Sequence, residues 1–388
     1  MLKYISADWI FPVNKPPMQN AVIAVKANGE VDAVLTENAA QNLNVEIVKY
    51  EGAIVPGFVN THCHLELSHM LGQIPVQTGL VEFVQSVIKS RQADAEKVSL
   101  AMQNADKQMF DNGIVAVGDI SNQLVSKEIK QNSRIFYHTF VEAMGFNPER
   151  ANTIMDFAIS LKNDFSPLPA SIVPHAPYSV SPQLFSLITE HAARENAFMS
   201  IHNQETSSEN DFFKSKSGGF LNLYKFLGLD IEFFQPTGKT SLQSWLPFIK
   251  TRKTLLVHNT VSSQEDVEFA NRNNQNLYWC LCPQANLYIE NELPDVELFI
   301  KEDLKITLGT DSLASNHQLN ILAEMKTIQT YKKLTFEKLL QWATINGAEF
   351  LGCQEKFGTI EVGKTPGLNL VQLSKDFIIE SEKVVKIV

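Results

Sequence analysis

Short apolar runs alternate with longer stretches of helical periodicity over most of the chain. Eight apolar runs can be counted, and they cover residues 53–60, 114–119, 135–141, 171–174, 198–201, 254–257, 277–281 and 306–308. Strands that alternate with helices are typical of repeated βα units and a parallel sheet. Eight such units in about 300 residues predict an α/β fold, a (β/α)8 TIM barrel.

The two ends of the chain show a different pattern of brief β segments without a long helical period. These segments are 8–12, 21–25 and 45–48 near the start, and 367–373 and 384–388 near the end. We therefore expect both ends to build one small β-sandwich domain. The expected division is 1–53 plus 357–388 for the small β domain and 54–356 for the barrel.

Composition narrows the class of protein and its partners. The chain has 388 residues, of which 44% are hydrophobic and 20% charged, and its net charge is -10. Such a composition fits a soluble protein with a sizeable core, and the negative field would repel nucleic acid. No segment is apolar enough to span a membrane or to act as an export signal. The expected partner is a small-molecule substrate, and a homodimer is compatible with the sequence.

The four cysteines do not show the paired spacing of a disulfide framework. They are Cys63, Cys280, Cys282 and Cys353. This usage favours a reducing, cytoplasmic setting. Cys280 and Cys282 fall two residues apart on a predicted strand, where barrel core is a more common role than metal binding.

Histidines gather at one end of the predicted strands. In a TIM barrel the active site lies at the carboxyl ends of the strands. The first run closes on His62 and His64, the fourth on His175, the fifth on His202, the sixth on His258 and the eighth on Asp311. His62 and His64 share one face of their strand, because side chains at i and i+2 point the same way.

Imidazole nitrogen and carboxylate oxygen hold a catalytic metal ion while leaving a position open for water. His62, His64, His202 and Asp311 supply these groups. We expect one divalent ion per subunit, with zinc favoured and iron as the alternative. Such an ion lowers the pKa of bound water from about 15.7 toward about 7, which makes hydroxide available near neutral pH.

Three further roles follow from positions near these ligands. Glu205 lies three residues beyond His202, and we interpret it as the general acid and base rather than a solvated loop glutamate. His258 is either a fourth nitrogen ligand or a partner of the bound hydroxide, and the second role is preferred. Asp311 would also accept the proton of the attacking water, whereas its structural alternative is a buried aspartate that caps a loop.

Contacts to the substrate are expected from residues at the same mouth. His175 is interpreted as a substrate contact in preference to a packing histidine. Glu66 and His69 follow the first histidine pair, and they either line the pocket or cap the next helix.

The motifs taken together resemble the amidohydrolase superfamily, in particular its mononuclear-metal aminohydrolase and chlorohydrolase branch. The resemblance covers nearly the whole chain and rests on the segments 56–64, 175–182, 202–205, 282–286 and 308–312. It implies that His62, His64, His202 and Asp311 bind the metal, that Glu205 shuttles protons and that His258 contacts the attacking water. Dinuclear relatives carry a bridging lysine at the fourth strand, where this chain has Pro174 and His175, so the resemblance implies one metal.

Within this branch, the segment 64–68 resembles the aminodeoxyfutalosine deaminases of a menaquinone pathway. Their substrate carries a carboxylate, and Arg91 on the helix after the first strand would bind it unless this arginine lies on a solvated helix face. Relatives often have arginine and serine where this chain has Gln284 and Ala285, so its specificity is expected to differ.

We therefore predict a metal-dependent hydrolytic deaminase of an adenine-bearing, nucleoside-like small molecule, with aminodeoxyfutalosine as the best substrate. One alternative is a chlorohydrolase, or another aminohydrolase of the guanine or S-adenosylhomocysteine type. An alternative of another class is an inactive barrel that acts as a binding module.

Overall fold

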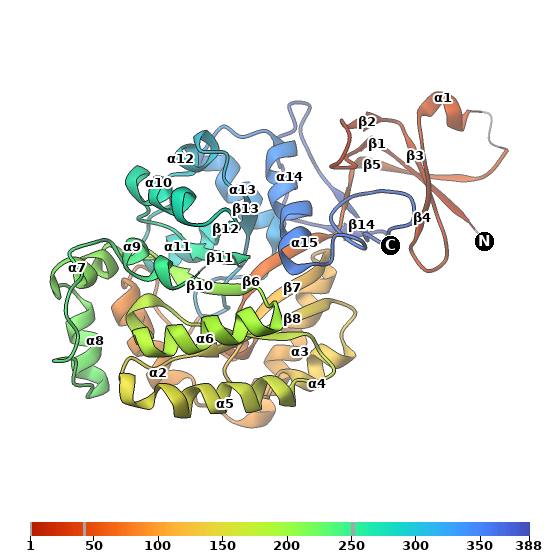
Figure 1. Cartoon of the computed structure of the whole chain (residues 1–388). Coiled ribbons are helices and arrows are strands. Elements are labelled where there is room, and N and C mark those ends of the chain that lie inside the picture. The colour runs from red at the N-terminus through yellow and green to blue at the C-terminus, as the bar shows by residue number, and fades with distance from the viewer. Residues whose placement is uncertain (1, 42–43, 250–252) are drawn as a thin grey trace.

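The computed structural model describes residues 2–41, 44–249 and 253–388 (Figure 1). It consists of an α/β body and a smaller all-β part at one side, where the N- and C-termini lie close to each other. This arrangement agrees with the expectation that both ends of the chain fold together.

The body contains two four-stranded parallel sheets in which strand order follows the sequence. The first sheet consists of β6 (Phe58–Cys63), β7 (Ile114–Ser121), β8 (Phe136–Ala143) and β9 (Ala170–Pro174), and the second of β10 (Met199–Asn203), β11 (Thr254–His258), β12 (Leu277–Leu281) and β13 (Ile306–Leu308). Each of the eight predicted apolar runs contributes to one of these strands.

Backbone hydrogen bonds join the two sheets at both junctions, near the carboxyl ends of the strands. At the β9–β10 junction, the amide of His202 donates to the carbonyl of His175 at 2.9 Å. At the β13–β6 junction, the amides of Thr310 and Asp311 both donate to the carbonyl of His62 at 3.1 Å. A parallel bridge between Cys63 and Asp311 lies at the same place.

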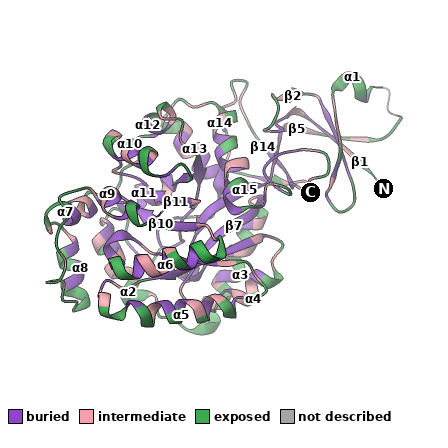
Figure 2. Cartoon of the chain, in the orientation of Figure 1, coloured by how far each residue is buried: buried purple, intermediate pink, exposed green. Residues whose placement is uncertain are grey.

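Helices cover the outside of the sheets and expose their polar faces, while the strands are buried (Figure 2). The α-helices of the body are α2 (Leu80–Ser90), α3 (Ala95–Asp111), α4 (Lys127–Asn132), α5 (Ala151–Asp164), α6 (Pro182–Glu195), α7 (Ser207–Ser215), α8 (Phe220–Leu227), α9 (Ser241–Trp245), α10 (Gln264–Asn273), α11 (Pro283–Ile289), α12 (Val296–Lys301), α13 (Ile321–Tyr331), α14 (Phe336–Ala343) and α15 (Ile345–Leu351). Short 3-10 helices are η1 (Leu65–Met70), η2 (Pro148–Arg150), η3 (Pro177–Ser179) and η4 (Leu246–Phe248). Among the described residues, every helix is too short or too polar to cross a lipid bilayer.

The terminal segments form one seven-stranded sheet. Its order is β15-β14-β5-β1-β3-β4, with β2 paired to β1. The strands are β1 (Lys3–Ile10), β2 (Met18–Gln19), β3 (Val22–Val25), β4 (Val31–Leu35), β5 (Ile47–Pro56), β14 (Leu368–Val371) and β15 (Val385–Lys386), and a short helix α1 (Glu37–Ala40) follows β4. All seven strands belong to one hydrogen-bonded network, so a sandwich of two sheets stays a prediction, as does the exact domain boundary.

The predicted strand 53–60 is wrong in its bounds, because the chain changes sheets within it. β5 stays in the terminal sheet up to Pro56, and β6 starts the first sheet of the body at Phe58. Gly57 between them has no room for a side chain: a Cβ there would lie 2.3 Å from the Val115 side chain and 2.7 Å from the Pro366 carbonyl oxygen. Glycine permits this close approach of three segments.

Candidate metal centre and active site

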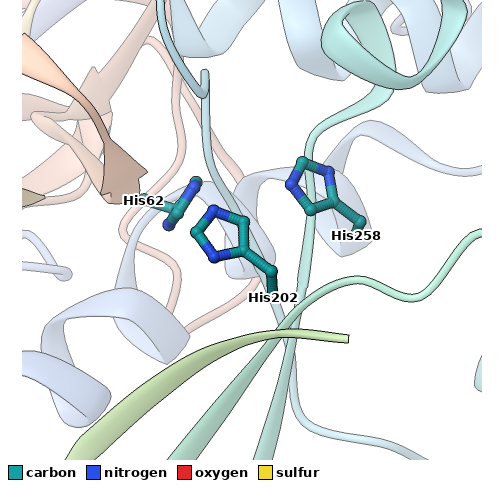
Figure 3. A group of neighbouring side chains, drawn as sticks. All are labelled: His62, His202 and His258. Atoms are coloured by element: carbon teal, nitrogen blue, oxygen red, sulfur yellow. The ribbon is translucent and has the colours of Figure 1, made fainter. Parts of the chain in front are cut away.

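The predicted ligands come from separate strands and meet at one point. His62 lies in β6, His202 in β10, and His258 ends β11. His64 directly follows β6, and Asp311 lies three residues beyond the last residue of β13, Leu308. Figure 3 shows the rings of His62, His202 and His258 gathered from three strands around a common space.

Short distances connect the four predicted ligands. His64 Nε2 lies 3.1 Å from His62 Nε2 and 3.3 Å from His202 Nε2. Asp311 Oδ1 lies 3.5 Å from His62 Nε2 and 3.4 Å from His64 Nε2. The structure therefore brings all four side chains into a group whose donor atoms converge.

The charge states of these groups fit a divalent cation. Burial, followed by the nearby His62, lowers the pKa of His64 to about 3, and burial lowers that of His202 well below its usual value. Both rings are therefore neutral, the form in which imidazole binds a metal. Burial alone would raise the pKa of Asp311, but its interaction with the adjacent His62 brings this pKa well below its usual value, which favours the charged carboxylate.

A hydrogen bond to the backbone fixes the tautomer of His202. Its Nδ1 donates to the backbone carbonyl of His175 at 2.8 Å, which leaves the Nε2 lone pair directed at His62 and His64. Metal-binding histidines are commonly oriented by such a bond. The donor set, with three imidazoles and one carboxylate, thus fits the expected mononuclear ion.

The backbone at this centre adopts conformations that cost free energy. His258 has φ 75° and Asp311 has φ 56°, both in the left-handed region that residues other than glycine rarely occupy. Strain of this kind costs roughly 1–3 kcal/mol per residue and is concentrated at functional sites. Here it turns two strand ends so that their side chains face the centre.

Glu205 lies beside the metal centre in a dry environment. It is buried, and its Oε1 lies 3.5 Å from His258 Nε2. Burial, with the nearby charge of Asp311, raises the pKa of Glu205 well above its usual range, which favours the neutral form that carries a proton. The alternative of a solvated loop glutamate is wrong, because this side chain does not reach the solvent.

His258 is placed between two partners. Its Nε2 is close to Glu205, and its Nδ1 lies 3.3 Å from Asn286 Oδ1. One ring nitrogen of His258 also lies within 4.8 Å of ring nitrogens of His62 and His202. This position of His258 is compatible with both predicted roles, a fourth metal ligand or a partner of the bound hydroxide.

His175 lies at the edge of the same group. Its ring centroid is 4.8 Å from that of His202, and its Nδ1 is 2.6 Å from Ser179 Oγ. Burial, followed by the nearby His62, lowers the pKa of His175 to about 4, so its ring is neutral.

Glu66 and Arg91 lie beside each other, and Glu66 also binds two backbone amides. Glu66 Oε1 accepts hydrogen bonds from the amides of Asn122 at 2.8 Å and Gln123 at 2.9 Å, and its Oε2 is 3.9 Å from Arg91 Nη2. His69 Nε2 contacts the carbonyl of Arg91 at 3.0 Å. In this structure Glu66 holds the loop after β7, and neither residue joins the group of metal-binding donor atoms within the described residues.

The sequence interpretation missed Glu142. This residue lies near the end of β8, and its Oε1 is 3.7 Å from His202 Nδ1. Burial raises its pKa to about 7. The signal was present, because Glu142 directly follows the predicted strand 135–141, and the strand-end rule that found the histidines applies to it equally.

Of the two residues that depart from the family motif, Gln284 binds α13 and Ala285 is buried in the core. The amide of Gln284 donates to Glu324 at 2.9 Å and its side chain to Thr327 at 3.3 Å, both on α13. Cys280 and Cys282 are buried in the core with their sulfur atoms 3.9 Å apart, as predicted.

Comparison with known proteins identifies the family. The profile described as the Amidohydrolase family matches residues 53–387. An adenosine deaminase of Helicobacter pylori is 26% identical over 331 residues, which cover 84% of this chain and 80% of the relative. An aminodeoxyfutalosine deaminase of Nitratiruptor sp. is 26% identical over 366 residues, which cover 90% of this chain and 87% of the relative.

Two solved structures have a similar fold. The aminofutalosine deaminase of Helicobacter pylori in complex with methylthio-coformycin has a TM-score of 0.82 at 22% identity, and the match covers 98% of this chain and 94% of the other. An adenosine deaminase from Xanthomonas campestris with bound zinc has a TM-score of 0.73 at 20% identity, with 98% and 90% covered. The chain belongs to the amidohydrolase family, and it is a hydrolase that acts on carbon–nitrogen bonds.

Proposed function

We propose that this protein is a metal-dependent deaminase that replaces the exocyclic amine of an adenine-type ring by oxygen and releases ammonia. The observation that carries the proposal is the position of the buried Glu205 next to His258, at the edge of a convergent three-histidine, one-aspartate group, where burial favours the protonated carboxyl group. A metal site alone would serve many hydrolases, whereas a neutral carboxyl group beside it provides the proton that an aromatic amidine needs.

We assign His62, His64, His202 and Asp311 as ligands of one divalent ion. The similarity to a deaminase structure with bound zinc supports zinc, and iron is the alternative. When bound, the ion supplies an activated water as the nucleophile.

Protein side chains then move the protons. Glu205 donates its proton to the ring nitrogen adjacent to the attacked carbon, which makes that carbon more electrophilic. His258 orients the attacking water and stabilises the charge that develops beside Glu205. Asp311 accepts one proton of the water as the carbon–oxygen bond forms, and Glu205, which has given up its own proton, takes the second. The carbon–nitrogen bond then breaks as ammonia leaves with a proton passed on by Glu205 or Asp311.

The substrate proposed in preference to others is aminodeoxyfutalosine, because relatives with that activity by name cover nearly the whole chain. His175, Glu66 and Arg91 are proposed as its contacts. We further propose that the two parallel sheets form one closed eight-stranded barrel over residues 54–356, with 1–53 and 357–388 as the small domain.

The test is ammonia release by zinc-loaded protein from adenosine, methylthioadenosine, S-adenosylhomocysteine, 5′-deoxyadenosine and aminodeoxyfutalosine. We expect turnover of adenine nucleosides, with the highest kcat/KM for aminodeoxyfutalosine. Release of chloride from a chlorotriazine without ammonia from any nucleoside would replace the proposal by the chlorohydrolase alternative. Deamination of guanine alone would favour another aminohydrolase, and protein that binds no metal would favour the inactive module.

A further inference from the structure

Glu142 is a buried carboxyl group that the proposed chemistry does not use. Its Oε2 accepts a hydrogen bond from Asn122 Nδ2 at 3.0 Å. Its Oε1 receives no hydrogen bond from any residue that the structure describes. A buried polar atom without a partner is costly and therefore requires an explanation, and a bound ligand that supplies the partner is one such explanation.

His175 offers a second acceptor close to this oxygen. The Ser179 hydroxyl donates to the Ala176 carbonyl at 3.1 Å, so the hydrogen-bond network assigns His175 Nδ1 as the donor to Ser179 Oγ. The lone pair of a neutral ring is then on Nε2, for which the described part of the chain provides no donor. A ring nitrogen of His175 and a carboxylate oxygen of Glu142 lie within 4.8 Å of each other.

The ligand of these two acceptors is not a second metal ion. Glu142 and His175 would need His202 as the third ligand. However, His202 Nδ1 carries a hydrogen that it donates to the carbonyl of His175, and its Nε2 belongs to the first centre. Glu142 and His175 offer two acceptor atoms, and His202 has no lone pair left to complete a metal site. Hydrogen-bond donors of a ligand therefore suit these two acceptors better than a metal ion.

Position distinguishes Glu142 from another buried glutamate with an unpaired oxygen. Glu209 also has one such atom, but it is enclosed by α7 and α9, where Ser241 donates to it. The side chain of Glu142 is also buried, but it lies near the end of β8, beside His175 and the predicted metal ligand His202. Its unpaired oxygen therefore borders the metal centre and not a helix interface.

We propose that Glu142, with His175 beside it, forms a subsite that binds sugar hydroxyl groups of the substrate. The inference rests on the proposed function, which supplies a nucleoside as the ligand. The imidazole ring of His202 separates Glu142 from the metal-binding nitrogens, so the subsite receives the substituent of the base rather than the reacting ring. Two neighbouring sugar hydroxyl groups provide one donor for Glu142 and one for His175. Hydroxyl groups are uncharged, so they bind there without a further charged residue.

The test compares adenosine with 2′,3′-dideoxyadenosine in zinc-loaded wild type and in the variants Glu142→Leu and Glu142→Gln. For wild type we expect kcat/KM to be about 10- to 100-fold higher for adenosine, the range for a hydrogen bond to a charged group. In Glu142→Leu this ratio should fall to about one, and in Glu142→Gln it should fall at least about threefold. The glutamine variant keeps the side-chain shape and decides the matter where the leucine variant does not fold.

Glu324→Gln is the matched control. Glu324 is also buried, but its two oxygens accept hydrogen bonds from Gln284 and Asn316 inside the protein, so its loss should leave the adenosine ratio at the wild-type value. A wild-type ratio near one, or a ratio that both Glu142 variants preserve, would overturn the subsite.

Calorimetry separates failure of the subsite from failure of the proposed function. If neither nucleoside is deaminated, the proposed function fails, and the dissociation constants of the same two compounds then decide the subsite. Tighter binding of adenosine that is lost in the Glu142 variants would support it. Equal affinities in wild type and variants, or no binding of either compound to wild type, would overturn it.

Discussion

A hydrogen bond can hold a side chain at the centre while it leaves the functional atom free. His202 is the clearest case, because its Nδ1 is bound to the His175 carbonyl and its Nε2 faces the other ligands. Glu205 is arranged differently: burial raises its pKa, which favours the neutral form, and it lies close to His258. The metal ligand His202 depends on a hydrogen bond, whereas the proton donor Glu205 depends on burial. A substitution can therefore remove proton transfer without removing the metal.

The first prediction concerns Glu205→Gln. This change removes the transferable proton but retains shape, so turnover should fall by about 10² or more while zinc content stays the same. Ammonia release and elemental analysis measure the two quantities.

Glu209→Gln is the matched control for this substitution, because Oε1 of Glu209 takes the internal hydrogen bonds and the new amide would replace its unpaired oxygen. We expect its turnover to stay within about threefold of wild type. Unchanged turnover of Glu205→Gln would remove Glu205 from the proton transfer.

The positions of the strands explain why so much could be predicted from the sequence. Residues that end parallel strands meet at one edge, so His62, His202 and His258 could be grouped without knowledge of their distances. The partners of Glu66 could not be predicted in this way, because they are backbone amides of the loop after β7, whose path has no periodic signal. The change of sheet at Gly57 was hidden for a similar reason: an apolar run reads the same in either sheet.

Between β7 and α4, a buried ion pair supports the strand end that carries the first histidines. Lys130 Nζ lies 2.6 Å from Asp119 Oδ2, and both side chains are fully buried. Asp119 Oδ1 in turn accepts the amide of Leu65, the residue after His64, at 2.8 Å. The pair thus fixes the backbone directly next to a metal ligand.

The second prediction is that Lys130→Met lowers the free energy of unfolding by about 3–5 kcal/mol, because the charge of Asp119 is left buried without its partner. Urea unfolding of the zinc-loaded protein measures the change. Lys107→Met is the control: it breaks an exposed pair with Asp111 and should cost less than about 1 kcal/mol. Equal, small losses in both variants would contradict the importance of the buried pair.

On the scale of the whole molecule, the metal centre lies across the two sheets. His62 lies in the first sheet and His64 directly after it, whereas His202 and His258 lie in the second sheet and Asp311 follows its last strand. An ion bound by these residues would connect both sheets near the two junctions where their backbones are hydrogen-bonded. Binding would therefore stabilise the body as a unit and not a single loop.

The third prediction concerns removal of the metal. Because the ion binds only the folded arrangement, free metal at about 1,000 times its Kd should add about 4 kcal/mol to the free energy of unfolding. A chelator should lower the Tm accordingly, and added zinc should restore it. Asp311→Asn, which weakens the site, should show a much smaller shift, and a Tm of wild type that does not respond to the chelator would exclude the site.

The junctions between the sheets also determine when the site comes into existence. Its first two histidines lie within the first 64 residues and its last ligand at 311, so nearly the entire body must be synthesised and docked before the ligands meet. A molecule with bound metal is thus one in which the body has finished folding. A nascent or half-unfolded chain has no assembled site. The ion therefore binds, and stabilises, only molecules in which both halves of the body have come together.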